Sequence, residues 1–244
     1  MPVDVLIDIG HSRLKWGRLV AGTLDPASIG RASTDEPGVL LSALEQGGCS
    51  GAIVSGQSRV ESVRQISEGL RQMGARVDIM ATGDREMPVA PAYKSLGCDR
   101  WLALQKPWCE LHAPFVVVDC GTAITVDLVD GKGHHRGGWI MPGVHAARGG
   151  LFARTPGLNR PLPEPGIIDR PARGTGSALV RGGLLQAIGG IDRAVRAAEQ
   201  AAEDHVSLWL TGGNAAELAA HLERPARQEQ HLVLHGLAMA THAK

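Results

Sequence analysis

The sequence is poor in aromatic residues, has no net charge and contains no long apolar run. Phenylalanine, tyrosine and tryptophan make up 3% of its 244 residues, so we expect a core of aliphatic side chains and alanine. Lysine and arginine number 25, as do aspartate and glutamate, and this balance does not favour nucleic acid or an anionic membrane. No apolar stretch reaches the roughly 20 residues of a membrane-spanning helix. We therefore expect neither nucleic acid nor a membrane as a partner.

Cysteine is scarce as well, and its spacing excludes some kinds of site. The 4 cysteines form no CxxC pair, which argues against a structural zinc site or a redox motif. The 10 histidines show no metal-ligand spacing. The amino terminus lacks the basic start and the apolar run of a signal peptide. We interpret the cysteines as reduced thiols and expect a cytoplasmic protein.

The chain is organised around Phe115–Asp127, which reads FVVVDCGTAITVD. The four apolar residues at its start predict a buried strand, and Asp119 follows at the end of that strand. Gly121 and Thr122 offer a turn with backbone N–H groups and a hydroxyl, before an alternating return strand. Such a unit can hold phosphate on its N–H groups and a cation on its carboxylate. Taken alone, the motif fits an ordinary hairpin better.

A second copy of this pattern stands at the amino terminus. An apolar strand, Val5–Ile7, ends in Asp8, then Gly10 and Ser12 form the turn, and a return strand follows. Two copies about half a chain apart suggest an internal duplication. The duplication shifts the interpretation from two ordinary hairpins to a pair of phosphate motifs.

The fold class follows from the order of the predicted elements. The first half reads βββαβαβ, the order of an RNase-H-like domain with helices packed on a mixed sheet. We predict an α/β protein with two RNase-H-like domains of the actin-like ATPase kind, over residues 1–114 and 115–244. Residues 25–37 are expected to form a surface connection, and residues 153–173 a loop over the site or a dimer interface. The other predicted elements, read from apolar periodicity, are helices at 38–46, 60–73 (with a capping box starting at Ser58), 101–106, 144–152, 174–203 and 215–222, and strands at 51–55, 77–81, 134–140 and 206–210.

The paired motifs resemble those of the acetate-and-sugar-kinase, Hsp70 and actin superfamily. Within that superfamily the chain is most similar to the type III pantothenate kinases, a family that includes Baf-like accessory factors. Each motif is weak alone, but the ordered set is specific, and the likeness runs nearly from end to end. The three matching segments are Asp8–Lys15 (DIGHSRLK), Gly97–Arg100 (GCDR) and Asp119–Thr125 (DCGTAIT).

The resemblance implies an activity: phosphorylation of pantothenate by ATP to 4'-phosphopantothenate, the first step of coenzyme A biosynthesis. It implies ATP with Mg²⁺ between the two halves, a monovalent cation (K⁺ or NH₄⁺) held by Asp119, and a homodimer whose pantothenate pocket includes both subunits. The residues that it implies for ATP binding are Asp8, Ile9, Gly10, His11, Ser12, Arg13, Leu14, Lys15 and Thr122.

Asp99 has two interpretations. Its position just before a predicted helix fits an N-cap. Phosphoryl transfer also needs a carboxylate that receives the proton of the acceptor hydroxyl, and the resemblance implies this catalytic role. Thr175, likewise, fits an N-cap hydroxyl or a pocket residue, with little to choose between them from the residues alone. The residues that the resemblance implies for pantothenate binding are Gly97, Cys98, Asp99, Arg100 and Thr175.

Two departures from the family pattern leave alternatives open. His11 and Ser12 stand where the family usually has Asn-Thr, so the hydroxyl is kept but the amide is lost. A family tyrosine falls near Ala90, and Tyr93 is displaced from it. The alternatives are a catalytically weak Baf-like accessory or regulatory protein, and a kinase of another small hydroxy acid. The intact carboxylates and Lys15 favour a kinase.

Overall fold

The structure, a computed structural model, describes residues 3–56 and 59–243. The chain divides into two compact units, and each unit is built on a five-stranded sheet. Each unit is made of more than one segment of the chain. The predicted single boundary between residues 114 and 115 therefore stays a prediction. Unit 1 comprises Met1–Ala113, Val129–Arg136 and His231–Lys244, and unit 2 comprises Pro114–Leu128 and Gly137–Gln230.

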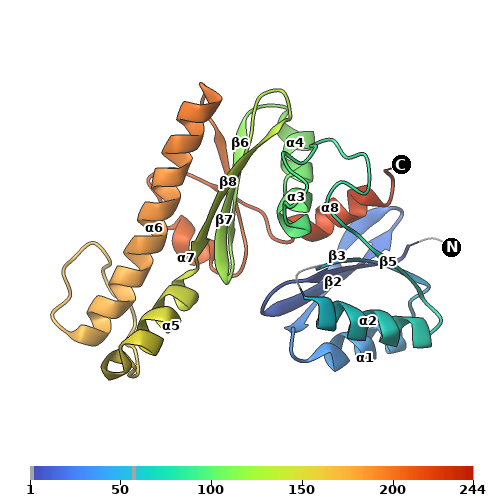
Figure 1. The fold of residues 1–244 in the computed structure, drawn as a ribbon, viewed down its shortest axis with the longest axis horizontal. Helices are drawn as coiled ribbons and strands as arrows, with labels where there is room; N and C mark the ends of the chain where they lie inside the picture. The colour runs from blue at the N-terminus through green and yellow to red at the C-terminus, as the bar shows by residue number, and fades with distance from the viewer. Residues whose placement is uncertain (1–2, 57–58, 244) are drawn as a thin grey trace. The chain divides into compact units, whose positions relative to one another are not determined.

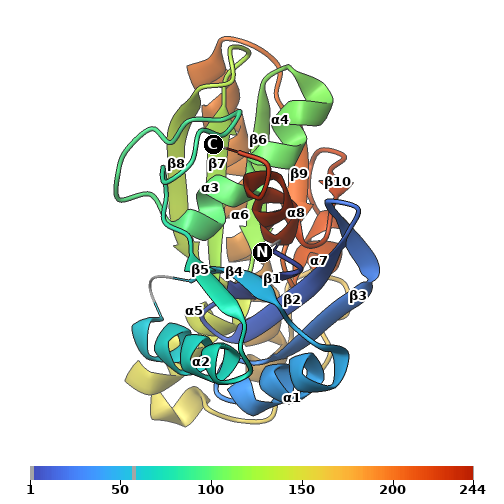
Figure 2. The ribbon, with the colours of Figure 1, turned by 90° about the vertical axis from the view of Figure 1, so that its right-hand side faces the viewer.

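The sheet of unit 1, coloured blue to teal in Figure 1, has the strand order β3-β2-β1-β4-β5, and Figure 2 labels all of its strands. The first three strands along the chain pair antiparallel, and the last two run parallel to β1 because helices connect them. The five strands are β1 (Val5–Ile9), β2 (Arg13–Val20), β3 (Thr23–Ser33), β4 (Gly51–Ser55) and β5 (Arg76–Ile79).

The third strand corrects the prediction of a surface connection over residues 25–37. β3 is an edge strand with few buried residues, so its sequence lacks the apolar alternation that marks a half-buried strand. Its position is set across the sheet, where Gly30 pairs with Trp16. A Cβ atom on Gly30 would lie 2.1 Å from the indole of Trp16, so the ring packs flat on the strand at that point.

Two helices cover one face of this sheet, α1 (Pro37–Gly47) and α2 (Val60–Gln72). Their apolar residues share one core with the side chains of alternate residues of β1, β2 and β4. The helices begin and end within a residue of their predicted bounds. The capping box predicted for α2 depends on Ser58, which lies outside the described residues.

The C-terminal helix α8 (Leu232–Ala240) belongs to unit 1 and packs against α3 (Cys98–Ala103) (Figure 2). Gly236 makes this approach possible, because a Cβ atom there would lie 2.3 Å from the backbone oxygen of Leu102. α8 also packs against β1 and against α4 (Gln105–Leu111). A closing apolar segment at the end of the chain thus supports the strand and the helix that carry the first two motifs.

The sheet of unit 2 has the order β8-β7-β6-β9-β10, which repeats the order of unit 1 strand for strand. β6 pairs parallel with β9, and β9 with β10, as β1 does with β4 and β4 with β5. The duplication and the two-domain fold class predicted from the sequence are confirmed. The strands of unit 2 are β6 (Phe115–Cys120), β7 (Ala123–Val129), β8 (His135–Pro142), β9 (Ser207–Thr211) and β10 (Arg227–Gln228).

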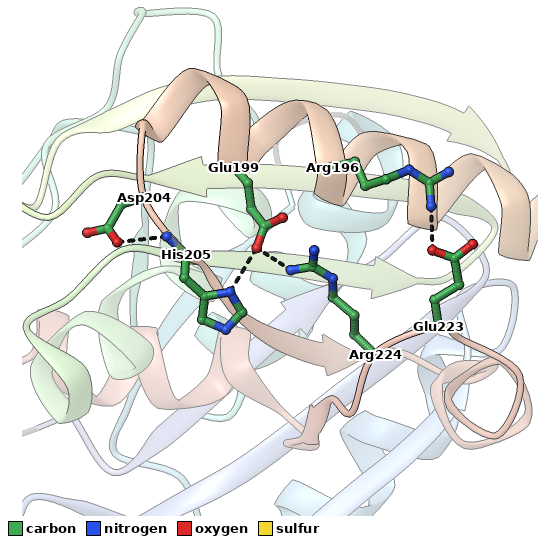
Figure 3. A network of polar contacts seen from close by, with 6 residues as sticks. All are labelled: Arg196, Glu199, Asp204, His205, Glu223 and Arg224. Carbon is green, nitrogen blue, oxygen red and sulfur yellow. Dashed lines mark hydrogen bonds and ion pairs between the residues drawn. The ribbon is translucent and has the colours of Figure 1, made fainter.

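The helices of unit 2 are dominated by α6 (Thr175–Ala202), whose apolar side lies on the core of the sheet. Ion pairs join the second half of α6 to the segment that follows α7, as Figure 3 shows. Arg196 pairs with Glu223, and Glu199 pairs with Arg224 and with His205. The other helices are α5 (Val144–Arg154), the 3₁₀ turn η1 (Pro156–Leu158) and α7 (Ala215–Ala219).

Of the helices in the described part of the chain, none combines the length and the apolar character needed to cross a bilayer.

Candidate active site

The first phosphate motif lies at the end of β1 in unit 1. Asp8 is the penultimate residue of the strand and is 6% exposed. It sits opposite Lys15 of β2 in the antiparallel pair, so the carboxylate and the ammonium group share one face of the sheet. The turn that follows is tight, because Gly10 N donates to the backbone oxygen of Arg13 at 3.0 Å. Thr34, the residue directly after β3, stabilises the turn, because its hydroxyl donates to the backbone oxygen of Gly10 at 3.0 Å.

The candidate ATP residues of this motif divide into two groups. His11, Ser12 and Arg13 are exposed at the turn, where their side chains can reach a phosphate. Ile9 and Leu14 are buried in the apolar core. Any contact of these last two residues with a nucleotide would therefore come from their backbone.

The second phosphate motif has the same construction in unit 2. Asp119 is the penultimate residue of β6, and the turn closes where Gly121 N donates to the oxygen of Ala123 at 3.1 Å. Gly143 backs the turn by donating its N–H to the oxygen of Thr122 at 2.9 Å. A Cβ atom on Gly143 would lie 2.3 Å from the oxygen of Gly121. The exposed Thr122 is therefore presented by a turn that is supported from behind.

The carboxylate of Asp119 lies against the glycines that follow β9. A Cβ atom on Gly212 would come within 2.3 Å of Asp119 Oδ1, and Asn214 N donates to the oxygen of Cys120 at 3.0 Å. Gly212 therefore allows the backbone after β9 to approach the second motif closely. Carboxylate and backbone oxygens are hard ligands of the kind that alkali and alkaline-earth cations prefer, so the donor set around Asp119 fits such a cation.

Asp99 lies inside α3, and this corrects its interpretation as an N-cap. The helix begins at Cys98 with Gly97 in the cap position, three residues before its predicted start. The Oδ1 atom of Asp99 accepts the N–H of Arg100 at 2.9 Å. The side chain is exposed. The same correction applies to Thr175, because Gly174 is the cap residue of α6 and Thr175 is the first residue of the helix.

Arg100 has a partner that the sequence did not reveal. Its Nη1 atom donates to the phenol oxygen of Tyr93 at 3.2 Å. The Tyr93 ring lies 6.1 Å from that of His135, whose Nδ1 accepts the N–H of Ala92 at 3.3 Å. The sequence offered one sign of this contact, because the one tyrosine of the chain stands shortly before GCDR. The contact itself depends on how the loop between Tyr93 and GCDR folds.

Unit 1 brings the first motif and the GCDR segment together. Burial, together with the negative charges of Asp99, Asp8 and Asp84, raises the pKa of the Cys98 thiol to about 12. Two of the proposed site carboxylates therefore lie near one thiol, and that thiol stays protonated and unreactive at neutral pH. Cys98 is a buried spacer in this arrangement, as expected of a small apolar residue.

The part of the chain that the structure describes contains no cluster of three or more histidine, cysteine, aspartate or glutamate side chains suited to a metal ion. Mg²⁺ in kinases commonly uses one or two carboxylates, with water and phosphate oxygens as its other ligands. The buried carboxylate of Asp8, at the end of a strand, fits that limited role.

A duplicated sheet with a carboxylate and a glycine turn at the end of each central strand defines the class of kinases and ATPases with two actin-like domains. Residues 5–197 match the model of a family described as type III pantothenate kinase. The chain belongs to the type III pantothenate kinase family.

Individual relatives agree with this assignment. The chain is 34% identical to a type III pantothenate kinase of Alkalilimnicola ehrlichii over 249 residues, which cover 98% of this chain and 97% of the relative. It is also 34% identical to that of Chromobacterium violaceum over 241 residues, 96% of this chain and 98% of the relative.

Two solved structures resemble the fold. One is a Campylobacter jejuni protein assigned to the Baf family of transcriptional activators, with a TM-score of 0.62 and 19% identity over 96% of this chain and 94% of that one. The other is a Sinorhizobium meliloti protein assigned as a 2-dehydro-3-deoxygalactonokinase, with a TM-score of 0.59 and 14% identity over 98% of each chain. At these identities the matches support the fold alone.

Proposed function

We propose that this protein phosphorylates pantothenate with ATP to give 4'-phosphopantothenate, the first step of coenzyme A biosynthesis. Membership of the family supports the activity. The observation that supports the proposal in this chain is that Asp99 and the phosphate-motif residue Asp8 both lie near enough to the Cys98 thiol to raise its pKa. An acceptor hydroxyl at Asp99 would thus lie near the motif that handles phosphate.

Asp99 is the proposed general base. An exposed carboxylate at the first turn of α3 can take the proton of the pantothenate hydroxyl as the phosphoryl group arrives. Its Oδ1 atom is occupied by the N–H of Arg100, so the proton goes to Oδ2. The Arg100 guanidinium, anchored by Tyr93, is suited to pair with the pantothenate carboxylate. Gly97, Cys98 and Thr175 complete the proposed substrate contacts.

The nucleotide is held by its phosphates. The turn N–H groups, the hydroxyls of Ser12 and Thr122 and the ammonium group of Lys15 are the proposed donors. They oppose the charge that develops on the transferred group. Mg²⁺, when bound with ATP near Asp8, neutralises part of the phosphate charge. His11 contributes a ring nitrogen where the family usually has an amide, and the other proposed ATP contacts are Gly10, Arg13 and the backbone of Ile9 and Leu14.

Asp119 is the proposed ligand of a monovalent cation, K⁺ or NH₄⁺. Its carboxylate is fixed between β6 and the glycines after β9. Such a cation would screen the carboxylate beside the Thr122 turn and keep that turn suitable for phosphate. Stimulation of turnover by K⁺ over Na⁺ is the expected consequence.

The protein is proposed to act as a homodimer in the cytoplasm. Support for a partner subunit comes from large apolar side chains that unit 2 leaves exposed on β8, α5 and α6, namely Trp139, Ile140, Leu151 and Leu185. Support for a reducing compartment comes from the cysteines at positions 49, 98, 109 and 120, which are all free thiols.

Asp99→Asn tests the proposed mechanism. The substitution keeps the shape of the side chain and removes its basicity, so turnover should fall about 10²- to 10⁴-fold, the usual contribution of a general base. Calorimetry should still detect pantothenate binding. Asp84→Asn is the matched control, because the charge of Asp84 also raises the pKa of Cys98 and Asp84 has no proposed catalytic role. Turnover by Asp99→Asn at the level of the control would remove Asp99 as the base.

A further inference from the structure

Ser55 is a buried polar residue that the proposed mechanism leaves unused. It is the last residue of β4 and is 0% exposed. Among the residues that the structure describes, its Oγ atom has no hydrogen-bond partner. A buried hydroxyl without a partner is unfavourable, and native proteins rarely keep one without a reason. The position therefore calls for a partner that the described residues do not supply.

The register of the sheet places Ser55 directly beside the first phosphate motif. Asp8 pairs with Ser55 on the parallel side of β1 and with Lys15 on the antiparallel side. The three residues thus form one row across β2, β1 and β4. Paired residues of neighbouring strands point to the same side of a sheet.

The side of the sheet follows from the strand alternation. Ile7 of β1 and Val54 of β4 belong to the core under α1 and α2. Side chains alternate along a strand, so Asp8 and Ser55, the next residues, face away from that core. The hydroxyl of Ser55 is therefore on the same face as the carboxylate of Asp8.

The row also lies where open α/β sheets bind their ligands. In such sheets the ligand sits beyond the carboxyl ends of the strands, at the point where the strand order reverses. Here that point is between β1 and β4 in the order β3-β2-β1-β4-β5. Asp8 is the penultimate residue of β1 and Ser55 is the last residue of β4, so both lie at the carboxyl ends of these two parallel strands.

We propose that Ser55 is a positioning residue for the divalent cation of the nucleotide. Its Oγ atom accepts a hydrogen bond from a water molecule in the hydration shell of Mg²⁺ held at Asp8. Mg²⁺ keeps several of its waters when it binds protein, and each of these waters points its hydrogen atoms at surrounding acceptors. The inference rests on the proposed function, since it needs Mg²⁺ and ATP at this motif.

Calorimetric titration of ATP into the full chain tests the inference, with Mg²⁺ in one series and EDTA in the other. Ser55→Ala should weaken ATP binding about threefold to tenfold in Mg²⁺ and leave binding in EDTA unchanged. Ser55→Thr keeps the hydroxyl and should retain most of the Mg²⁺ effect. The KM for pantothenate should not change in either variant.

Ser67→Ala is the matched control. Ser67 is 1% exposed, and its hydroxyl too lacks a partner within the described residues, but it lies on α2 among residues of the helical core. This variant should bind ATP like the wild type in both series. Thermal melting of the two alanine variants should show no loss of stability, because each removes a buried hydroxyl that has no partner among the described residues.

Several results would overturn the inference. Equal ATP affinity of wild type and Ser55→Ala in Mg²⁺ would exclude a role at the cation. An equal loss in Mg²⁺ and EDTA would show direct contact with the nucleotide, and a large drop in melting temperature would show a partner within the protein. A wild-type protein that binds no ATP in Mg²⁺ would instead contradict the proposed function itself.

Discussion

Gly212→Ala tests the link between the second phosphate motif and the glycines after β9. The backbone of Gly212 has a φ of +92°, and a Cβ atom there would lie 2.3 Å from Asp119 Oδ1 and 2.7 Å from backbone atoms of Cys120. Alanine therefore introduces both backbone strain and a clash with the proposed cation ligand. The parallel pairing of β6 and β9 prevents the two segments from simply moving apart.

Gly137→Ala separates the cost of the backbone strain from the cost of the clash. Gly137 has a φ of +91°, and a Cβ atom there would meet nothing within 4 Å. The left-handed backbone should cost each variant about 1–2 kcal/mol. Overpacking adds about 1–3 kcal/mol at Gly212 only. Gly212→Ala should therefore lose about 2–5 kcal/mol of unfolding free energy in total.

The assay combines thermal melting with turnover in K⁺ or Na⁺. A chain of this size shifts its melting temperature by about 2–4 °C per kcal/mol. Gly212→Ala should therefore melt about 2–12 °C below Gly137→Ala. Turnover by the folded Gly212→Ala protein should also lose its preference for K⁺, since Asp119 Oδ1 must move. Equal melting temperatures and an equal response to K⁺ in the two variants would refute the reasoning.

Two further predictions concern unit 1. Burial alone would raise the pKa of the Asp4 carboxyl, but hydrogen bonds from Gly51 and Ser50 outweigh it and lower that pKa. The stability that the ionised Asp4 carboxylate gives the folded protein should therefore be fully present above the unfolded pKa of about 3.9. It should be lost as the pH falls through the lower pKa of the folded state. Asp4→Asn should lower the unfolding free energy by about 1–2 kcal/mol at pH 7 in urea titrations, and it should weaken the loss of stability at acid pH. The same loss of stability at acid pH in the variant and the wild type would contradict this role of Asp4. Tyr93→Phe removes the 3.2 Å contact with Arg100 and should raise the KM for pantothenate about threefold to tenfold. The KM for ATP should stay constant in steady-state assays, and an equal rise in both would count against this role.

Local patterns predicted much of the architecture. The strand Gly51–Ser55 has its predicted bounds, because it is a short apolar run between turn residues. The two carboxylate–glycine turns also lie at the ends of buried strands, as expected. These features depend on residues close together in the sequence, and the pattern of such residues is enough to predict strands, turns and helices.

The features that escaped prediction depend on residues far apart in the sequence. β3 is polar and half-exposed, and only its pairing with β2 makes it a strand. The helix containing Asp99 starts earlier than its apolar pattern, since Gly97 and not a side-chain cap begins it. The contact of Tyr93 with Arg100 and the unpaired hydroxyl of Ser55 become visible only once loops and strands are placed. The start of the helix, the Tyr93 contact and the Ser55 hydroxyl all belong to the candidate site itself.

Release of ADP by the purified protein, with ATP, Mg²⁺ and pantothenate, tests the central claim most directly. The measurement is made in K⁺ and in Na⁺, and again without pantothenate. We expect release that depends on pantothenate and is faster in K⁺. The absence of pantothenate-dependent release at high ATP, while pantothenate still binds, would contradict the claim. That result would point instead to an accessory protein with a degenerate nucleotide site.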